Sequence, residues 1–447
     1  MLASYRKLLL SRLPSYSDGI PFASFAQSLS AELYEQILAA TQYLPGDKLD
    51  EIQRELLASI IKYARNHVPF YREYLESVRT IEDFDMLPPV SKERMRQEFD
   101  KKTVIAESWA DFGLLQFTSG STGVPFRFFL DKRFASRALA RYRRMTKWCG
   151  RTETDSVVRL MPRDFFGHED TDTFLKCADP EDLKRQLPAL LDLWRRKSII
   201  LLSRTSHLTR LAQLLEPLDT KPKFKALISC AEQLYPNVRR YIERVLNAPV
   251  FNYYGSNETT AIGFECQYHD GFHVQSELVY VEILGEDNRR LHAGEVGDIV
   301  VTVFDNRVMP FIRYKIGDRG YWSDRPCPCG RMLPRIYIEG RDTNAFSLPD
   351  GRVGHFASLI HPISAMVERV EQYQVDRLSP ENFLLKIVPT EKFRPSDPAL
   401  LQTELTRYLG PRVALSIRII HRLEKTEGGK PRAFVNHCPD PLPDLLK

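Results

Sequence analysis

Apolar residues recur at helical spacing in the first hundred positions and form short uninterrupted runs further along the chain. Between residues 31 and 100 the apolar positions share one helical face and prolines mark the end of the stretch: Leu33, Ile37, Ile52, Leu56, Leu57, Ile60, Pro69, Pro88 and Pro89. This spacing predicts helices, because residues three and four positions apart lie on the same side of an α-helix.

From about residue 155 to 255, apolar runs alternate with amphipathic stretches. The runs cover residues 157–161, 198–202, 224–229 and 250–254. Between the second and third runs, Leu208, Leu211 and Leu215 share one helical face. Repeats of strand, helix and strand predict a mostly parallel sheet covered by helices.

After residue 270 the pattern changes to β, with strand-like segments separated by Gly, Asp and Asn turns. A polar stretch near Arg341 precedes a last segment with a helix, an extended pair, a helix and a strand, at 359–370, 372–388, 398–409 and 414–420. We therefore expect an α/β fold in two domains. The domain from 1 to 340 is large, with mostly parallel sheets covered by helices, and divides into helical (1–100), α/β (101–265) and β-rich (266–340) parts. Residues 341–447 form a small α+β carboxyl-terminal lobe.

Composition agrees with an ordinary soluble globular protein of more than one domain. The chain has 447 residues, of which 43% are hydrophobic and 27% charged. The net charge of +5 lies in short clusters, such as 141–144 and 195–197. These clusters slightly favour binding of anionic ligands, and the alternative is that they are solvated faces of helices. The lack of a long basic tract argues against binding of nucleic acid.

Nothing in the chain predicts a membrane or secreted protein. No run approaches about 18 apolar residues, and no cleavage site follows the short amphipathic amino terminus. Seven cysteines, an odd and scattered set, do not make a disulfide framework. We expect a cytoplasmic monomer or homodimer that acts on a small molecule.

The run FTSGSTGVP, residues 117–125, has two glycines and four hydroxyl residues after an apolar run. Glycines let the backbone approach a ligand closely, while hydroxyls and free N–H groups donate to phosphate oxygens. The run predicts a phosphate-binding loop, with a polar hairpin turn as the alternative. It is not a Walker A loop, since Val124 and Pro125 follow Gly123 where Lys and Ser or Thr are needed.

Four further segments carry candidate chemistry. Glu258 is the last residue of NYYGSNE, which follows an apolar strand. A carboxylate at this place either binds Mg²⁺ on a nucleotide or is a charge at the amino terminus of a helix. Asp318 lies between two glycines and either accepts from ribose hydroxyls or belongs to a type I turn. Arg341 either donates to a ribose or phosphate or is an exposed cation. Lys430, in EGGKPR, is a cation suited to neutralising the negative charge that develops on an oxygen during group transfer.

Taken in this order, the motifs resemble the adenylate-forming superfamily of acyl and aryl CoA ligases. FTSGSTGVP looks like its phosphate loop, while SCAEQL (229–234) and NYYGSNE look like its adenine-binding and Glu-bearing segments. Within it, the chain is most similar to the phenylacetate CoA ligase branch and to capsule-biosynthesis adenylating proteins. Three features carry that likeness: YARNHVPFYREY followed by LPPVSKERMR, the CPCGR segment, and LPDGR.

The resemblance implies attack of a substrate carboxylate on the α-phosphorus of Mg·ATP, which gives an acyl adenylate and pyrophosphate. It implies Lys430 and Glu258 as catalytic residues, with Glu258 anchoring Mg²⁺. It implies a nucleotide site made of Thr118, Ser119, Gly120, Ser121, Thr122, Gly123, Ala231, Glu232, Asn252, Tyr253, Tyr254, Gly255, Asp318 and Arg341. Coenzyme A is the implied acceptor, while a carrier-protein thiol, an amine or a hydroxyl stays open.

Two positions depart from the superfamily pattern. Phe126 and Arg127 follow Pro125, where many relatives carry a Lys, which leaves open whether Arg127 replaces that lysine. Thr343 and Asn344 replace an acidic hinge pair. These departures make a catalytically silent nucleotide-binding homologue one alternative, and a phosphotransferase that makes ADP is another. Aromatic residues in the pocket-forming segments suggest an aryl acid or simply core packing: Tyr142, Trp148, Phe165, Phe166 and Tyr235.

The cysteines predict a metal site. CPCGR brings Cys327 and Cys329 close together, and ECQYHDGFH supplies Cys266 with His269 and His273. Three Cys and one His complete a closed four-coordinate Zn²⁺ site, which is structural because no open position remains. The alternative is a reduced, metal-free pair of cysteines on a turn, and the resemblance alone favours His273 over His269.

Overall fold

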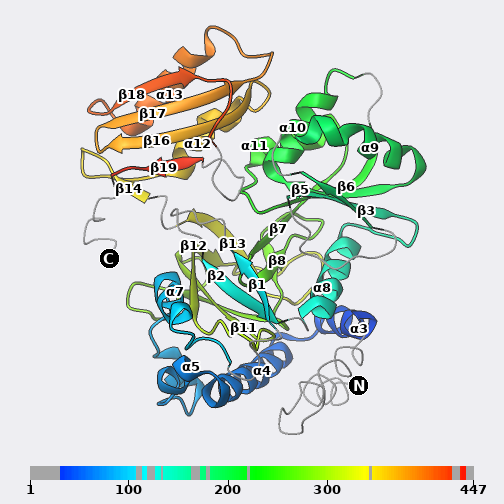
Figure 1. Ribbon diagram of the computed structural model, residues 1–447, viewed down its shortest axis with the longest axis vertical. Helices are drawn as coiled ribbons and strands as arrows, with labels where there is room; N and C mark the ends of the chain where they lie inside the picture. The colour runs from blue at the N-terminus through cyan, green and yellow to red at the C-terminus, as the bar shows by residue number, and fades with distance from the viewer. Residues whose placement is uncertain are drawn as a thin grey trace.

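The protein is described here by a computed structural model covering residues 31–106, 113–117, 126–131, 134–162, 172–177, 182–218, 222–341, 345–424 and 433–438. An eleven-stranded sheet runs through the larger part, and a four-stranded sheet forms the carboxyl-terminal lobe above it in Figure 1. The mixed α/β fold with a small α+β lobe is as expected. None of the described helices combines the length and apolar character needed to cross a bilayer.

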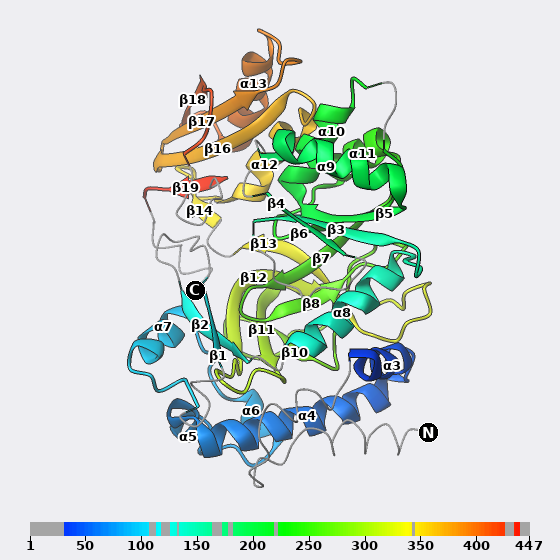
Figure 2. The same cartoon turned by 45° about the vertical axis from the view of Figure 1, so that its right-hand side comes forward.

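Helices form the amino-terminal part, as the apolar spacing predicted. They are α3 (Ala31–Thr41), α4 (Gly46–His67), α5 (Pro69–Tyr74), α6 (Ile81–Asp85) and α7 (Lys92–Asp100). Helix α4 buries Ile52, Leu56 and Ile60 on one face, and it runs beneath the large sheet in Figure 2. Thr80 and Ser91 accept from backbone N–H groups at the starts of α6 and α7, which fixes where both helices begin.

The parallel half of the large sheet has the predicted alternation of strand and helix. Its strands are β3 (Ser156–Met161), β4 (Thr173–Lys176), β5 (Ile199–Arg204), β6 (Phe224–Cys230) and β7 (Val250–Ser256), and they pair in the order β4-β3-β5-β6-β7. Helices α9 (Asp182–Arg196), α10 (Thr205–Leu215) and α11 (Pro236–Leu246) cover one face, while α8 (Phe134–Trp148) covers the other. Because both faces are covered, β3 and β5 are buried along their whole length.

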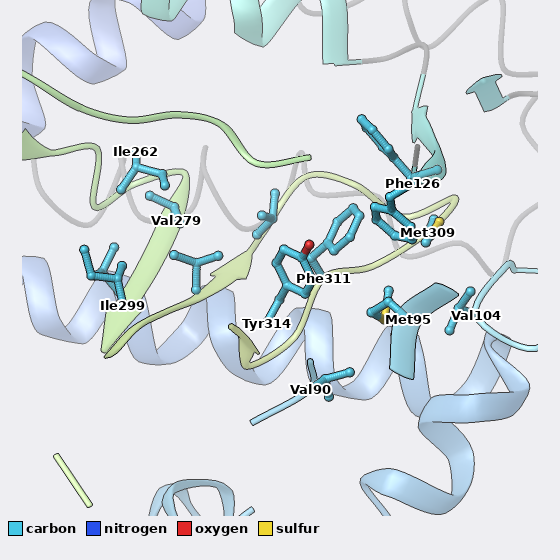
Figure 3. Close-up of a cluster of buried hydrophobic side chains, with 14 of the residues drawn as sticks. Val90, Met95, Val104, Phe126, Ile262, Val279, Ile299, Met309, Phe311 and Tyr314 are labelled. Atoms are coloured by element: carbon cyan, nitrogen blue, oxygen red, sulfur yellow. The ribbon is translucent and has the colours of Figure 1, made fainter. Parts of the chain in front are cut away.

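At β7 the sheet changes from parallel to antiparallel pairing. It continues through β8 (Thr260–Phe264), β9 (Phe272–Val274), β13 (Arg335–Arg341), β12 (Tyr314–Trp322), β11 (Gly297–Val303) and β10 (Val279–Leu284). The β-rich part thus extends the parallel sheet. A separate hairpin, β1 (Gly113–Phe117) with β2 (Arg127–Asp131), packs against its core, where Figure 3 shows Phe126, Phe311 and Tyr314 among the buried side chains.

The carboxyl-terminal lobe has its own core and its own sheet. Its elements are β14 (Ala345–Ser347), β15 (Val353–His355), α12 (Phe356–Ala365), β16 (Val370–Ser379), β17 (Asn382–Pro389), α13 (Asp397–Leu409), β18 (Ala414–Ile419) and β19 (Phe434–Asn436). The order of helices and extended segments matches the prediction. The lobe rests on α10 and α11, where Arg210 pairs with Glu371 at 3.0 Å and Gln213 Nε2 donates to Val367 O at 2.7 Å.

Arg313 ties the amino-terminal helices to the start of β12. Its side chain is fully buried, its Nη2 lies 3.1 Å from a Glu282 oxygen, and its Nη1 donates to the carbonyls of Phe84, Asp85 and Leu87. Replacing Arg313 with Met would remove the guanidinium donor from those carbonyls and weaken the pairing of a buried carboxylate. We expect the free energy of unfolding to fall by about 3–5 kcal/mol, measured by urea denaturation.

Arg127→Met is the matched control, because Arg127 pairs with Asp100 where both side chains are more than half exposed, at 55% and 58%. An exposed pair contributes at most about 1 kcal/mol. Equal denaturation midpoints for the two variants would contradict the role assigned to Arg313.

Candidate active site

The two ends of the predicted phosphate loop meet beside the β7–β8 hairpin. Phe117 and Arg127 are paired across β1 and β2, so the chain leaves and re-enters the hairpin at one place. Asn257 Nδ2 donates to Phe117 O at 3.3 Å, and Phe126 is buried in the core beneath. The loop residues themselves, Thr118, Ser119, Gly120, Ser121, Thr122 and Gly123, lie outside the described residues.

Glu258 lies in the turn between β7 and β8, buried, with 4% of the residue exposed. Its Oε1 accepts from Lys92 Nζ at 2.9 Å and from the Tyr314 hydroxyl at 3.0 Å. Burial alone raises the pKa of this carboxyl, but the Lys92 ammonium and these hydrogen bonds hold the pKa below its usual value. The alternative of a helix amino-terminal charge is wrong, because the chain turns directly from one strand into the next.

Backbone geometry fixes this turn. A Cβ on Gly255 would lie 1.9 Å from Thr260 O, so a larger residue would push the two strands apart. Thr260 itself has φ of +57°, a conformation that β-branched residues rarely adopt. Strained residues of this kind gather at functional sites, and here the strain lies two residues from Glu258.

Asp318 lies within β12, so the alternative of a type I turn is wrong. Its Oδ2 accepts from the Tyr254 hydroxyl at 3.0 Å. Arg341 is its cross-strand partner on β13, although the side chain of Arg341 lies outside the described residues. The two positions proposed for ribose therefore face one another across neighbouring strands.

The segment proposed for adenine follows the carboxyl end of β6. Ala231 has φ of +63°, and Glu232 Oε2 accepts from Ser206 N at 2.8 Å, so Glu232 caps the start of α10. On β7, Asn252 N donates to a Glu265 oxygen at 2.9 Å, and Tyr253 packs against Phe264. In this structure Glu232 caps α10, and Asn252 joins β7 to Glu265.

These contacts, together with the chain itself, connect the site residues into one group. Phe117, at one end of the loop, accepts from Asn257, and the neighbouring Glu258 accepts from Tyr314 at the start of β12. Strand β12 also carries Asp318, which accepts from Tyr254. The group lies around the carboxyl end of β7, and ligands of α/β proteins bind outside the carboxyl ends of the strands. Lys430 lies outside the described residues.

Sequence reasoning missed Lys92 and gave Arg127 an open role. Arg127 lies on the outer face of its strand, 2.8 Å from Asp100, because Phe126 and Phe128 on either side point into the core. Lys92 reaches Glu258 from α7, and its ammonium lies 5.6 Å from the centre of the Phe126 ring. The lysine missing from the loop was the signal that could have prompted a search for another cation nearby.

The four predicted zinc ligands come together behind α8. Cys266, His273, Cys327 and Cys329 have their ligand atoms all within 4.8 Å of one another. The Sγ atoms of Cys266 and Cys327 are 3.6 Å apart, and Cys329 Sγ is 3.4 Å from His273 Nε2. In a tetrahedral Zn²⁺ site, sulfur–sulfur and sulfur–nitrogen edges measure about 3.8 and about 3.6 Å.

The surroundings of this cluster favour the same ligand set. His273 Nδ1 lies 3.1 Å from Leu333 O. When Nδ1–H donates to this carbonyl, Nε2 is left unprotonated, and it lies 3.4 Å from Cys329 Sγ. His269 contacts Glu265 and Arg239 instead, outside the cluster. Without a metal, burial raises the pKa of the Cys266 thiol to about 12. Three cysteine sulfurs and one imidazole nitrogen are nonetheless a donor set that fits Zn²⁺.

Of the three predicted pocket aromatics that the structure describes, two are core residues. Trp148 Nε1 donates to Gln42 at 3.0 Å, and Tyr142 is buried beneath Arg159. Tyr235 packs between the large part and the carboxyl-terminal lobe. Phe165 and Phe166 lie outside the described residues.

Known proteins share this sequence pattern and fold, although no protein-family model matches the chain. It is 24% identical over 327 residues to phenylacetate-coenzyme A ligase of Thermus thermophilus, covering 66% of this chain and 70% of that one. It is 21% identical over 437 residues to protein CapK of Staphylococcus aureus, covering 92% and 94%. The resemblance found in the motifs is confirmed.

Solved structures confirm the fold. A 2-hydroxyisobutyryl-CoA ligase in the postadenylation state, in complex with 2-HIB-AMP, matches with a TM-score of 0.75 at 20% identity and covers 89% of this chain and 91% of that one. The same ligase in the thioesterification state matches with a TM-score of 0.62, at 20% identity, covering 90% and 92%.

Proposed function

We propose that this chain is an adenylate-forming acid ligase of the phenylacetate CoA ligase type. It activates a small carboxylic acid with ATP, releases pyrophosphate, and transfers the acyl group to coenzyme A. The observation that carries the proposal is the group formed by Phe117 at one end of the loop, Glu258, Asp318 and Tyr254. The fold shared with acyl-CoA ligases supports it.

The reaction asks the protein mainly for positioning and charge stabilisation. In this proposal Thr118, Ser119, Ser121 and Thr122 hold the β and γ phosphates, while Asp318 and Arg341 hold the ribose. Ala231 and Tyr254 flank the adenine. Lys430 reaches the substrate carboxylate and the α-phosphate from the lobe, which we take to begin at Arg341.

Magnesium belongs to the proposal through Glu258. Its carboxylate stays ionised despite burial, which suits a hard cation that prefers oxygen ligands. When bound, the ion neutralises phosphate charge during displacement. Lys92 and Tyr314 hold the carboxylate in place from the protein side.

We also propose zinc at Cys266, His273, Cys327 and Cys329. Four protein ligands leave no open coordination position, so the metal is structural. Arg331, next to the cluster, lies over Trp148 at 4.2 Å and its Nε donates to Gln42 at 3.1 Å. The metal would thus hold the turn at 327–333 against α8 and the end of α3.

The nucleotide product tests the function. We expect the purified chain to release AMP and pyrophosphate from ATP with one or more acids in a panel of aryl, hydroxy, fatty and amino acids. Coenzyme A should convert the adenylate to a thioester, detected by mass spectrometry, and a carrier-protein thiol, an amine and a hydroxyl are the other acceptors to test. Formation of ADP would indicate a phosphotransferase, and no turnover with any acid would indicate a silent homologue.

A further inference from the structure

One segment that stands out in the sequence, residues 63–74, has no part in the proposed reaction. It covers the end of α4 and the whole of α5. Its apolar side is packed into the protein, where Val68 and Tyr71 are fully buried. Its polar side chains, Arg72 and Glu73 among them, are exposed at the end of the molecule opposite the carboxyl-terminal lobe (Figure 1). The outer side of this segment can therefore bind a ligand of its own.

A cavity of about 430 Å³ lies on this outer side. Pockets that take small molecules have volumes of roughly 300–1,000 Å³. The lining comes from the end of α4, from α5 and from the turn that follows α5: Arg65, Pro69, Arg72, Glu73, Glu76 and Arg79. Because it has three guanidinium groups against two carboxylates, the lining carries a net positive charge.

Two of the guanidinium groups meet at one carbonyl oxygen. Arg65 Nη2 donates to Val78 O at 2.6 Å, and Arg79 Nη1 donates to the same oxygen at 3.1 Å. Neither guanidinium has a carboxylate within ion-pair distance among the described residues. Arg65 Nε is also buried, and no atom in the described part of the chain accepts from it. An oxyanion beside these two groups would offset their mutual repulsion and accept from their remaining N–H groups.

The other charged groups of the lining suit a ligand that carries both a phosphate and hydroxyls. Arg72 is exposed on α5 and makes no hydrogen bond or ion pair with the residues that the structure describes. Its planar guanidinium can therefore donate two parallel hydrogen bonds to one phosphate. Glu73 and Glu76 are exposed as well, and their carboxylates can accept from hydroxyl groups.

We propose that this cavity binds a small hydroxylated phosphate monoester, such as a sugar phosphate, with the phosphate on Arg65, Arg72 and Arg79. The site is separate from the proposed nucleotide site, because neither Glu258 nor Asp318 lines the cavity and the opposite side of α5 packs into the core. The inference goes beyond the proposed function and does not depend on it.

Calorimetry with inorganic phosphate and glucose 6-phosphate as probes tests the site, with AMP in excess to occupy the nucleotide site. We expect both probes to bind, and Arg72→Met to weaken their binding about 10- to 100-fold, the effect of losing charged hydrogen bonds. This variant should fold normally, because Arg72 has no partner to lose and Met suits a helix equally well. Lys62→Met is the matched control, since Lys62 is exposed on α4 but does not line the cavity, and it should change the affinities less than about two-fold.

The absence of binding by both probes would overturn the proposal. An equal loss of affinity in Lys62→Met would overturn it as well, because any surface cation would then have the same effect. Competition between AMP and the probes would assign the phosphate to the nucleotide site, and equal binding of glucose would exclude phosphate as the recognised group. Failure of the proposed function is separate, since it would appear as no release of AMP and pyrophosphate from ATP.

Discussion

Lys430→Ala is expected to lower acid-dependent exchange of labelled pyrophosphate into ATP by about a thousand-fold or more, while the fold stays intact. The reason is electrostatic, since a preorganised cation aimed at charge that develops during transfer is worth several kcal/mol in a site that excludes water. Lys430 lies outside the described residues and precedes β19 in the sequence, and β19 pairs with β16 of the lobe's sheet. Exchange is the right measurement because it reports adenylation without the second step.

Arg407→Ala is the control for this prediction. Arg407 is a cation of the same lobe, 71% exposed on α13, and it pairs with Glu404, which is also exposed. Its removal tests whether any loss of positive charge from the lobe is enough to slow exchange. Undiminished exchange in Lys430→Ala, or an equal loss in Arg407→Ala, would remove Lys430 from the proposed mechanism.

The parallel half of the sheet was predictable because its strands are buried on both faces. Such strands appear as uninterrupted apolar runs, and the helices between them show one apolar face. Leu208, Leu211 and Leu215 are buried on α10 as their spacing indicated. The local sequence is therefore sufficient to predict where these strands and helices lie.

Pairing between distant segments was not predictable in the same way. The β-rich part extends the parallel sheet because β9 pairs with both β8 and β13, although about sixty residues separate β9 from β13. The pair of Lys92 and Glu258 joins residues 166 positions apart. A single sequence carries no signal for such partners beyond the types of residue involved.

Two local ambiguities were settled by tertiary structure. Glu258 follows an apolar strand, which suits either a helix start or a turn, and the pairing of β7 with β8 makes it a turn. Asp318 has glycine neighbours that are typical of a turn, yet Gly317 with φ of +84° lets β12 continue past the irregular register with β11. The outward position of Arg127, by contrast, could have been predicted from its apolar neighbours on an alternating strand.

Removal of the proposed zinc is expected to have the largest effect on stability. Zinc-binding free energies at structural sites are about 10–16 kcal/mol at neutral pH, and binding to the folded state alone converts into stability. The ligands come from two segments, around Cys266 and around Cys327, so the metal would close a loop of about sixty residues that also contains Glu282 and Asp318. We expect about one zinc per chain by elemental analysis and a melting temperature lowered by more than about 10 °C after chelation or in Cys327→Ala.

Cys149→Ala is the matched variant for this prediction. Cys149 is also a buried thiol, 6% exposed, but it lies outside the cluster. It should keep the zinc and lose only the stability of a small packing change, about 1 kcal/mol. A purified chain without zinc, whose melting temperature responds equally to Cys149→Ala and Cys327→Ala, would contradict the metal site. In that case the close approach of Cys266, Cys327 and Cys329 would reflect packing of reduced thiols on a turn, and the order of the turn at 327–333 would depend on Arg331 with Trp148 and Gln42 alone.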